Sequence, residues 1–226
     1  MKLAKRIFAI LLLVTLSLSM VACAEVYVLG VTTPTTPLAV SDGSTVSDFK
    51  TPVAYRNDYF KYTCVLPDDW YVMNRDEMDQ ILGMTTDTLG ENEETDVIRE
   101  SFDNGVTLMD FYALSGDGST TISVVLEKAR PLAIVASEQQ VLDASTPLSV
   151  VSLERMGLTD IKHSTGTVDF LGEEHVALFI QGDFQGTMVY QTLLIIQNGF
   201  YISNIAVSGT DQAAIQECLQ YFQPID

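Results

Sequence analysis

The last third of the chain alternates between strand-like runs and tight-turn signals, and this pattern constrains the fold more than any other feature. The runs lie near Ser164–Phe170, His175–Gln181, Thr187–Gln197 and Phe200–Ser208. The segments between them contain glycine, and the last is the Asn198-Gly199 pair, a strong signal of a two-residue hairpin turn. Strands that follow one another through hairpins pair antiparallel, so the pattern predicts an antiparallel β-meander.

The segment before the meander mixes further strands with helices. Tyr59–Leu66 alternates with apolar residues on one face, and 106–114 and 121–127 flank a glycine-rich turn as a hairpin. Asn74 and Ser137 each precede a Glu or Gln by three residues, which is the capping-box signature of a helix start. The sequence therefore predicts, before the meander, one strand followed by a helix and then a β-hairpin followed by a second helix.

A last helix is expected from about 211 to 222, because its apolar residues fall on one face. Pro147 is expected to break or restart the helix that begins after Ser137. With 226 residues, 47% of them apolar, the chain has enough material for a sizeable core. The predicted fold class is α+β, with one domain over 55–226 whose central antiparallel sheet is covered by helices.

The N-terminus has the pattern of an export signal. Lys2, Lys5 and Arg6 form a basic start, and Ile7–Ala22 is an uncharged, mostly apolar run. This run is short for a membrane-spanning helix, which needs about 20 residues, and it fits the apolar core of a signal peptide. Residues 1–22 are therefore predicted to be a signal peptide, which places the rest of the chain outside the cytoplasm.

The residues around the cleavage point are Ser19-Met20-Val21-Ala22-Cys23-Ala24, and they resemble a bacterial lipobox. That resemblance implies that Cys23 receives a diacylglycerol on its thiol and becomes the first residue of a membrane-anchored lipoprotein. Met20 stands where the lipobox usually has Leu. Two alternatives are open: cleavage after Ala24 at an A-x-A site, which would release the protein free, and an uncleaved anchor.

Residues 23–54 contain two Thr-Thr-Pro repeats followed by a Ser- and Gly-containing stretch. Such a composition favours extended chain without a core, so this segment is predicted to be a tether between the lipid and the domain. The alternative for a few of its residues is an added edge strand, formed by Glu25–Leu29 or Val53–Tyr55.

The chain is strongly acidic, with 12 Lys and Arg against 30 Asp and Glu and a net charge of −18. Without the three basic residues of the signal peptide the balance is 9 − 30 = −21. Such a surface repels nucleic acids and anionic headgroups, so nucleic-acid binding is excluded as a function.

Twelve acids and two bases lie between Asp68 and Asp103, and several of the acids, from Asp87 to Asp96, are expected in a loop. This stretch is interpreted either as a solvated surface that maintains solubility or as a site for a divalent cation or a basic partner. Aromatic side chains are a further candidate for a partner surface, although core packing explains most of them equally well; they are Tyr55, Tyr59, Tyr71, Tyr112 and Phe184.

The sequence contains none of the common catalytic or metal-binding motifs. The sequence has no GxSxG, P-loop, HExxH, CxxC or EF-hand pattern. His163 and His175 are the only histidines, and a zinc site across their hairpin would need Glu173 or Glu174 as further ligands. We therefore expect no enzyme activity, no metal and no cofactor.

Three features together resemble the PsbP-like superfamily: Tyr55-Arg56-Asn57-Asp58-Tyr59-Phe60, Leu66-Pro67-Asp68-Asp69-Trp70, and the meander with its C-terminal helix. This group includes the extrinsic photosystem II protein and the nuclear import factor that binds Ran, and the resemblance spans about 55–226. It implies an α/β/α sandwich that docks proteins without catalysis. No metal-binding or partner-contact motif of the photosynthetic members is present.

In a fold of this kind the C-terminal helix packs on the sheet, which implies that Cys64 and Cys218 can meet. Outside the cytoplasm a disulfide between them is permitted. The alternative is two separate buried thiols that behave as small apolar side chains.

The expected function is that of a lipid-anchored, extracytoplasmic lipoprotein whose domain binds or assembles an envelope protein without catalysis. Two alternatives belong to other classes. One is a receptor for a small ligand or a divalent cation, and the other is a hydrolase whose catalytic residues have no recognisable motif.

Overall fold

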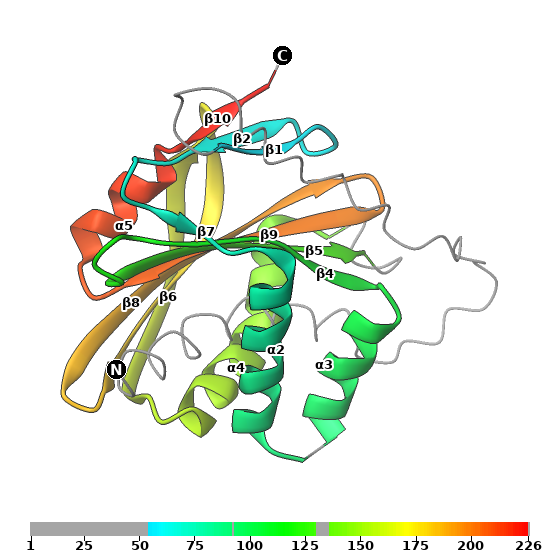
Figure 1. The fold of residues 1–226 in the computed structure, drawn as a ribbon, viewed down its shortest axis with the longest axis vertical. Helices are drawn as coiled ribbons and strands as arrows, with labels where there is room; N and C mark the ends of the chain where they lie inside the picture. Colours follow the sequence, from blue (N-terminus) through cyan, green and yellow to red (C-terminus); the bar gives the residue numbers. More distant parts are fainter. Residues whose placement is uncertain (1–53, 92, 130–135, 226) are drawn as a thin grey trace.

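The computed structural model describes residues 54–91, 93–129 and 136–225. The export signal, the lipobox at Cys23 and most of the tether lie outside these residues and stay predictions. In chain order the elements are β1 (Ala54–Asn57), β2 (Tyr62–Val65), β3 (Tyr71–Val72), α2 (Arg75–Leu89), α3 (Glu93–Asp103), β4 (Thr107–Leu114), β5 (Thr120–Lys128), α4 (Glu138–Arg155), β6 (Thr159–Phe170), β7 (Glu173–Phe184), β8 (Thr187–Asn198), β9 (Tyr201–Gly209), α5 (Gln212–Leu219) and β10 (Phe222–Pro224) (Figure 1).

A seven-stranded antiparallel sheet forms the centre of the molecule, in the order β3-β4-β5-β9-β8-β7-β6. The predicted meander is confirmed as β6 to β9, and the predicted hairpin as β4 and β5. The two units join because β9 pairs with β5 from Thr120↔Gly209 to Lys128↔Tyr201. Nearly all residues of β5 and β9 are buried, which is the pattern of central strands covered on both faces.

Three helices cover one face of this sheet (Figure 1). The predicted helix starts are confirmed: Asn74 and Glu77 form a complete capping box at α2, and Ser137 and Gln140 form another at α4. Each box satisfies backbone N–H groups that the first turn of a helix leaves without partners. The helices bury apolar side chains such as Ile81 and Leu142 against the sheet.

The expectation that Pro147 breaks the second helix is wrong, since α4 runs unbroken from Glu138 to Arg155. Proline has no N–H to donate to the carbonyl of Asp143, which lies on the exposed side of the helix. Neighbouring hydroxyls bond the local carbonyls, with Thr146 Oγ1 donating to Leu142 O at 2.7 Å and Ser149 Oγ to Ser145 O at 3.1 Å. Because the Asp143 carbonyl is on the exposed side, water can replace the missing N–H, and the helix continues through the proline.

The loop expected across the acidic residues is also wrong. Helix α2 continues to Leu89, and α3 begins at Glu93 after a short turn. Arg99 on α3 explains part of this order, because its guanidinium lies 3.3 Å from Asp87 and 3.8 Å from Asp96. Glu91 lies in that turn, and the other acids from Asp87 to Asp96 lie on helices whose apolar side chains, such as Ile98, face the core.

The opposite face of the large sheet is covered by α5 and by a second, three-stranded sheet in the order β1-β2-β10 (Figure 1). The strand β10 was not expected, since 222 was assigned to the final helix; α5 ends at Leu219, and Phe222 pairs with Cys64. Strand β1 begins at Ala54 and pairs with β2, so the alternative of an edge strand at Val53–Tyr55 holds for Ala54 and Tyr55, while Val53 lies outside the described residues. The α+β class is confirmed, with a small sheet beside the helix in the second outer layer.

Candidate functional site

The two cysteines of the domain lie in the core. Cys64 on β2 and Cys218 on α5 are buried in the same apolar cluster, and both are free thiols in the structure. Burial raises the pKa of both thiols, to about 12 for Cys218. They are therefore poor nucleophiles, and a disulfide between them stays a prediction for an oxidising compartment.

The two histidines do not come together. In the β6–β7 ladder His163 faces Ile180 and His175 faces Val168, so five ladder positions separate them. His175 instead bonds Glu138 at the start of α4, with 2.8 Å between Nδ1 and Oε1. Among the residues that the structure describes, no three His, Cys, Asp or Glu side chains are grouped as a metal site would need.

The aromatic residues considered as a partner surface are mostly core. Tyr55, Tyr112 and Phe184 are buried, which contradicts their use as an exposed surface. Tyr59 and Tyr71 are 46% and 47% exposed. The Tyr59 hydroxyl donates to the carbonyl of Asn198 at 2.9 Å, so this side chain holds the β8–β9 turn against the small sheet.

The most unusual surface feature is the free edge of the large sheet. Strand β6 is the outermost strand, and within the described residues it pairs only with β7. It is 12 residues long, and most of its side chains are exposed, including the run from Lys162 to Thr165. The other end of the sheet is the two-residue strand β3. A long edge strand presents a row of unpaired N–H and C=O groups to which another strand can add.

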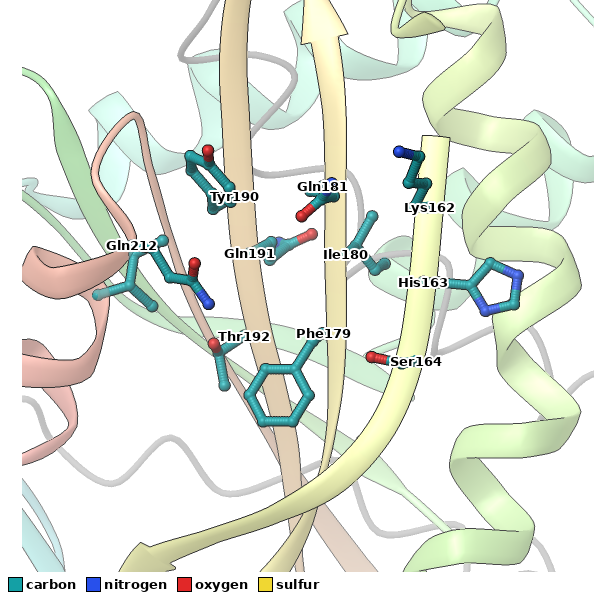
Figure 2. A pocket seen from close by; sticks show the side chains of 11 residues that line it. Lys162, His163, Ser164, Phe179, Ile180, Gln181, Tyr190, Gln191, Thr192 and Gln212 are labelled. Carbon is teal, nitrogen blue, oxygen red and sulfur yellow. The ribbon is translucent and has the colours of Figure 1, made fainter. Parts of the chain in front are cut away.

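A groove lies on the α5 side of this edge. It encloses about 340 Å³ between α5 and the strands β6, β7 and β8. Its lining is rich in amides and hydroxyls, with Gln181, Gln191 and Gln212 beside Tyr190 and Thr192 (Figure 2). Side chains that donate and accept hydrogen bonds are well placed here to contact a polar group beside the strand.

A second groove, of about 660 Å³, lies between β6 and α4. Pro147, Val150 and Val151 form its apolar part, and Asp143 and Glu154 lie at its two ends along the helix. His163 and Ser164 line both grooves, and Figure 2 shows the His163 ring pointing toward the neighbouring helix.

This arrangement is suited to binding an extended peptide. A strand added to β6 would make main-chain hydrogen bonds with the edge, and its side chains would alternate between the two faces. One set would enter the amide-lined groove by α5 and the other the groove by α4.

The sequence did not single out this site. The expected strand began at Ser164, whereas β6 begins at Thr159, and its position at the edge depends on the β5–β9 pairing. The available signal was the polar composition of 159–167, which has few apolar residues to bury on either face.

No family model and no curated protein matches this chain. Several solved structures are similar to it, including the following three. The cyanobacterial PsbP of Synechocystis is 9% identical with a TM-score of 0.47, over 79% of this chain and 95% of that one. A protein from Bacteroides thetaiotaomicron is 10% identical with a TM-score of 0.43, over 78% and 49% of the two chains. LpqN of Mycobacterium tuberculosis, described as involved in cell envelope biogenesis, is 11% identical with a TM-score of 0.41, over 73% and 83%.

None of the described helices is long and apolar enough to cross a membrane.

Proposed function

We propose that this chain is a lipid-anchored, extracytoplasmic lipoprotein whose domain binds another envelope protein by strand addition, without catalysis. The observation that carries this proposal is the 12-residue edge strand β6, which lies between two grooves. Main-chain bonds to the edge supply affinity, and the grooves select alternate side chains. The anchor is inferred from the basic start, the apolar run and Cys23.

Site-specific photo-crosslinking in the native host tests the docking role. A photoreactive residue would replace Thr165 on β6, and Glu100 on the exposed side of α3 would serve as the control position. We expect one reproducible protein adduct from position 165 and none from position 100. Equal adducts from both positions, or no adduct from 165, would contradict docking at this edge.

The anchor is tested separately with Cys23→Ser. We expect wild type in the membrane fraction and the variant in the soluble extracytoplasmic fraction or the medium. An unchanged distribution would exclude acylation at Cys23, whereas soluble wild type would favour cleavage after Ala24.

A small-ligand receptor is the second candidate function, because the groove by α5 has a lining of three glutamines, a tyrosine and Lys162. Thermal unfolding with a panel of metabolites and divalent cations tests it. A ligand present at about 100 times its Kd would raise the free energy of unfolding by about 2.7 kcal/mol. A panel without any shift would leave the docking role as the proposal.

A further inference from the structure

We propose that the segment added to β6 carries the pattern basic–x–apolar–x–basic on the side that faces α4. Its two cationic side chains would meet Asp143 and Glu154, and its central apolar side chain would lie on Pro147 and Val150. This inference rests on the proposed function, because it assumes that strand addition to β6 occurs.

The spacing follows from the geometry of helix and strand. Asp143, Pro147, Val150 and Glu154 follow one another at helical intervals and form one stripe of α4 that lines the groove. With about 1.5 Å of rise per residue, the two carboxylates are separated by about 16 Å along the helix. Same-face residues four apart on a strand are separated by about 13 Å. The long, flexible side chains of Lys or Arg make up the difference.

The charges around the groove favour a cationic segment. Asp143 and Glu154 are exposed, and Asp143 accepts a hydrogen bond from Gln139 Nε2 at 2.6 Å, which leaves its negative charge in place. Strand β6 also carries Asp160 and Asp169, which lie outside the lining of this groove and add to the negative charge of the strand.

The basic groups near the groove are Lys162 and His163 on β6 and Arg155 at the end of α4. Of these, only His163 lines the α4 groove. With a net charge of −18 on the whole chain, long-range attraction also acts on a basic segment and increases the rate of its association.

A second copy of this domain does not fit the pattern. In the whole chain the only two basic residues four positions apart are Lys2 and Arg6, which lie in the predicted signal peptide. Strand β6 itself has Lys162 without a second base four residues away. The segment therefore belongs to a different protein.

Synthetic strand peptides test the pattern against the full chain carrying Cys23→Ser. The central five residues would be Lys-Thr-Val-Thr-Lys, and a matched peptide of the same composition would read Lys-Thr-Val-Lys-Thr. A third peptide would have Glu in place of both lysines. Fluorescence anisotropy at about 50 mM salt, where exposed charges are weakly screened, would give the affinities.

We expect the first peptide to bind, the rearranged peptide to bind about 3- to 10-fold more weakly, and the acidic peptide to bind more weakly still. The double variant Asp143→Asn with Glu154→Gln should lose the same factor for the first peptide. Asp79→Asn with Glu100→Gln, which neutralises exposed acids of α2 and α3, should leave its affinity unchanged. Equal affinity for all three peptides, or no binding of any of them, would overturn the basic pattern.

N-methylated peptides separate this inference from the proposed function. Only alternate amides of an added strand bond the edge, so methylation of one alternate set should abolish binding and methylation of the other set should not. If alternate sensitivity is seen but basic and acidic peptides bind equally, strand addition stands and the basic pattern fails. If the basic peptide binds but neither methylated set matters, strand addition itself fails.

Discussion

The Tyr55 hydroxyl donates a hydrogen bond to Asp110 Oδ2, which joins the small sheet to a bulge in β4. Asn57 Nδ2 lies 3.0 Å from the Tyr55 oxygen and 3.4 Å from the same carboxylate oxygen. The Tyr55 ring stacks on Phe111 with 4.7 Å between centroids. This polar group is therefore surrounded by core packing, and its loss should weaken the contact between the two sheets.

We expect Tyr55→Phe to lower the free energy of unfolding by about 1–3 kcal/mol, because the ring remains while the half-buried Asp110 carboxylate loses one of its two donors. Urea unfolding measures this change. Tyr59→Phe is the matched control, since its hydroxyl bonds Asn198 at an exposed position, and it should cost less than about 1 kcal/mol. Equal losses from the two variants would show that burial of the Asp110 group does not matter.

The same carboxylate should give stability a defined pH dependence. Burial raises the pKa of Asp110 above its ordinary value, against the lowering effects of the Tyr55 hydrogen bond and the Arg75 charge. The folded state binds this proton more tightly than the unfolded state. The contribution of Asp110 protonation to the free energy of unfolding is therefore complete below the ordinary Asp pKa of about 3.9. It is lost as the pH rises through the raised pKa.

Asp110→Asn removes this titration and keeps an acceptor for Tyr55. The stability of wild type minus that of the variant should therefore decrease as the pH rises from about 4, and then level off above the raised pKa. Urea unfolding of both proteins across this range measures the difference. A difference that stays constant or grows with pH would contradict a raised pKa at Asp110.

Much of the fold could be predicted because its signals are local. The meander is built from hairpins between neighbouring strands, and the Asn-Gly signal marked the last of them, although Asn198 pairs with Tyr201 and the turn residues are Gly199, at φ +57°, and Phe200. Both capping boxes need only residues three apart, so Asn74 and Ser137 marked the starts of α2 and α4 correctly.

The remaining features depend on contacts between distant segments. Helix α3 was missed because its acidic composition resembles a loop, whereas Ile98 is buried in the core and Arg99 bonds two acids. Strand β10 forms only because β2 lies beside it after folding. The candidate site was missed for the same reason: β6 becomes an edge strand only when β9 pairs with β5, 79 positions apart at Val125 and Asn204.

The buried thiols should be unreactive in the folded protein. Cys64 and Cys218 are 0% and 2% exposed, and burial raises the pKa of both, which keeps them protonated near pH 8. We expect the reduced Cys23→Ser protein to take up no alkylating reagent until it unfolds, and then two equivalents by mass. Rapid labelling of either thiol in the folded state would contradict the described packing. A second sample is kept without reducing agent. If it takes up no reagent even in denaturant, Cys64 and Cys218 are joined by a disulfide.

Helix α4 is tied to the sheet by Glu138, which bonds both the His175 ring at 2.8 Å and the backbone N–H of Val176 at 3.0 Å. Glu138→Ala removes both bonds at a partly buried position, so we expect it to lower the free energy of unfolding by about 1–3 kcal/mol. Glu174→Ala, an exposed neighbour of His175, should change it by less than about 0.5 kcal/mol. Similar values for the two variants in urea unfolding would show that the link contributes little.

Replacing Pro147 should change the stability of the fold and peptide binding at the candidate site in opposite directions. Pro147→Ala supplies a backbone N–H that can donate to the carbonyl of Asp143, which stabilises the helix. Proline also restricts the unfolded chain, and losing that restriction costs less than the new hydrogen bond gains. We therefore expect the free energy of unfolding to rise by about 1 kcal/mol. The same change removes part of the apolar surface of the α4 groove, so the Lys-Thr-Val-Thr-Lys peptide should bind more weakly. Val151→Thr is the control, because it makes the same groove less apolar at a nearly unchanged helix propensity, and it should weaken binding without stabilising the helix. A loss of stability in Pro147→Ala would show instead that α4 needs the proline for its own packing.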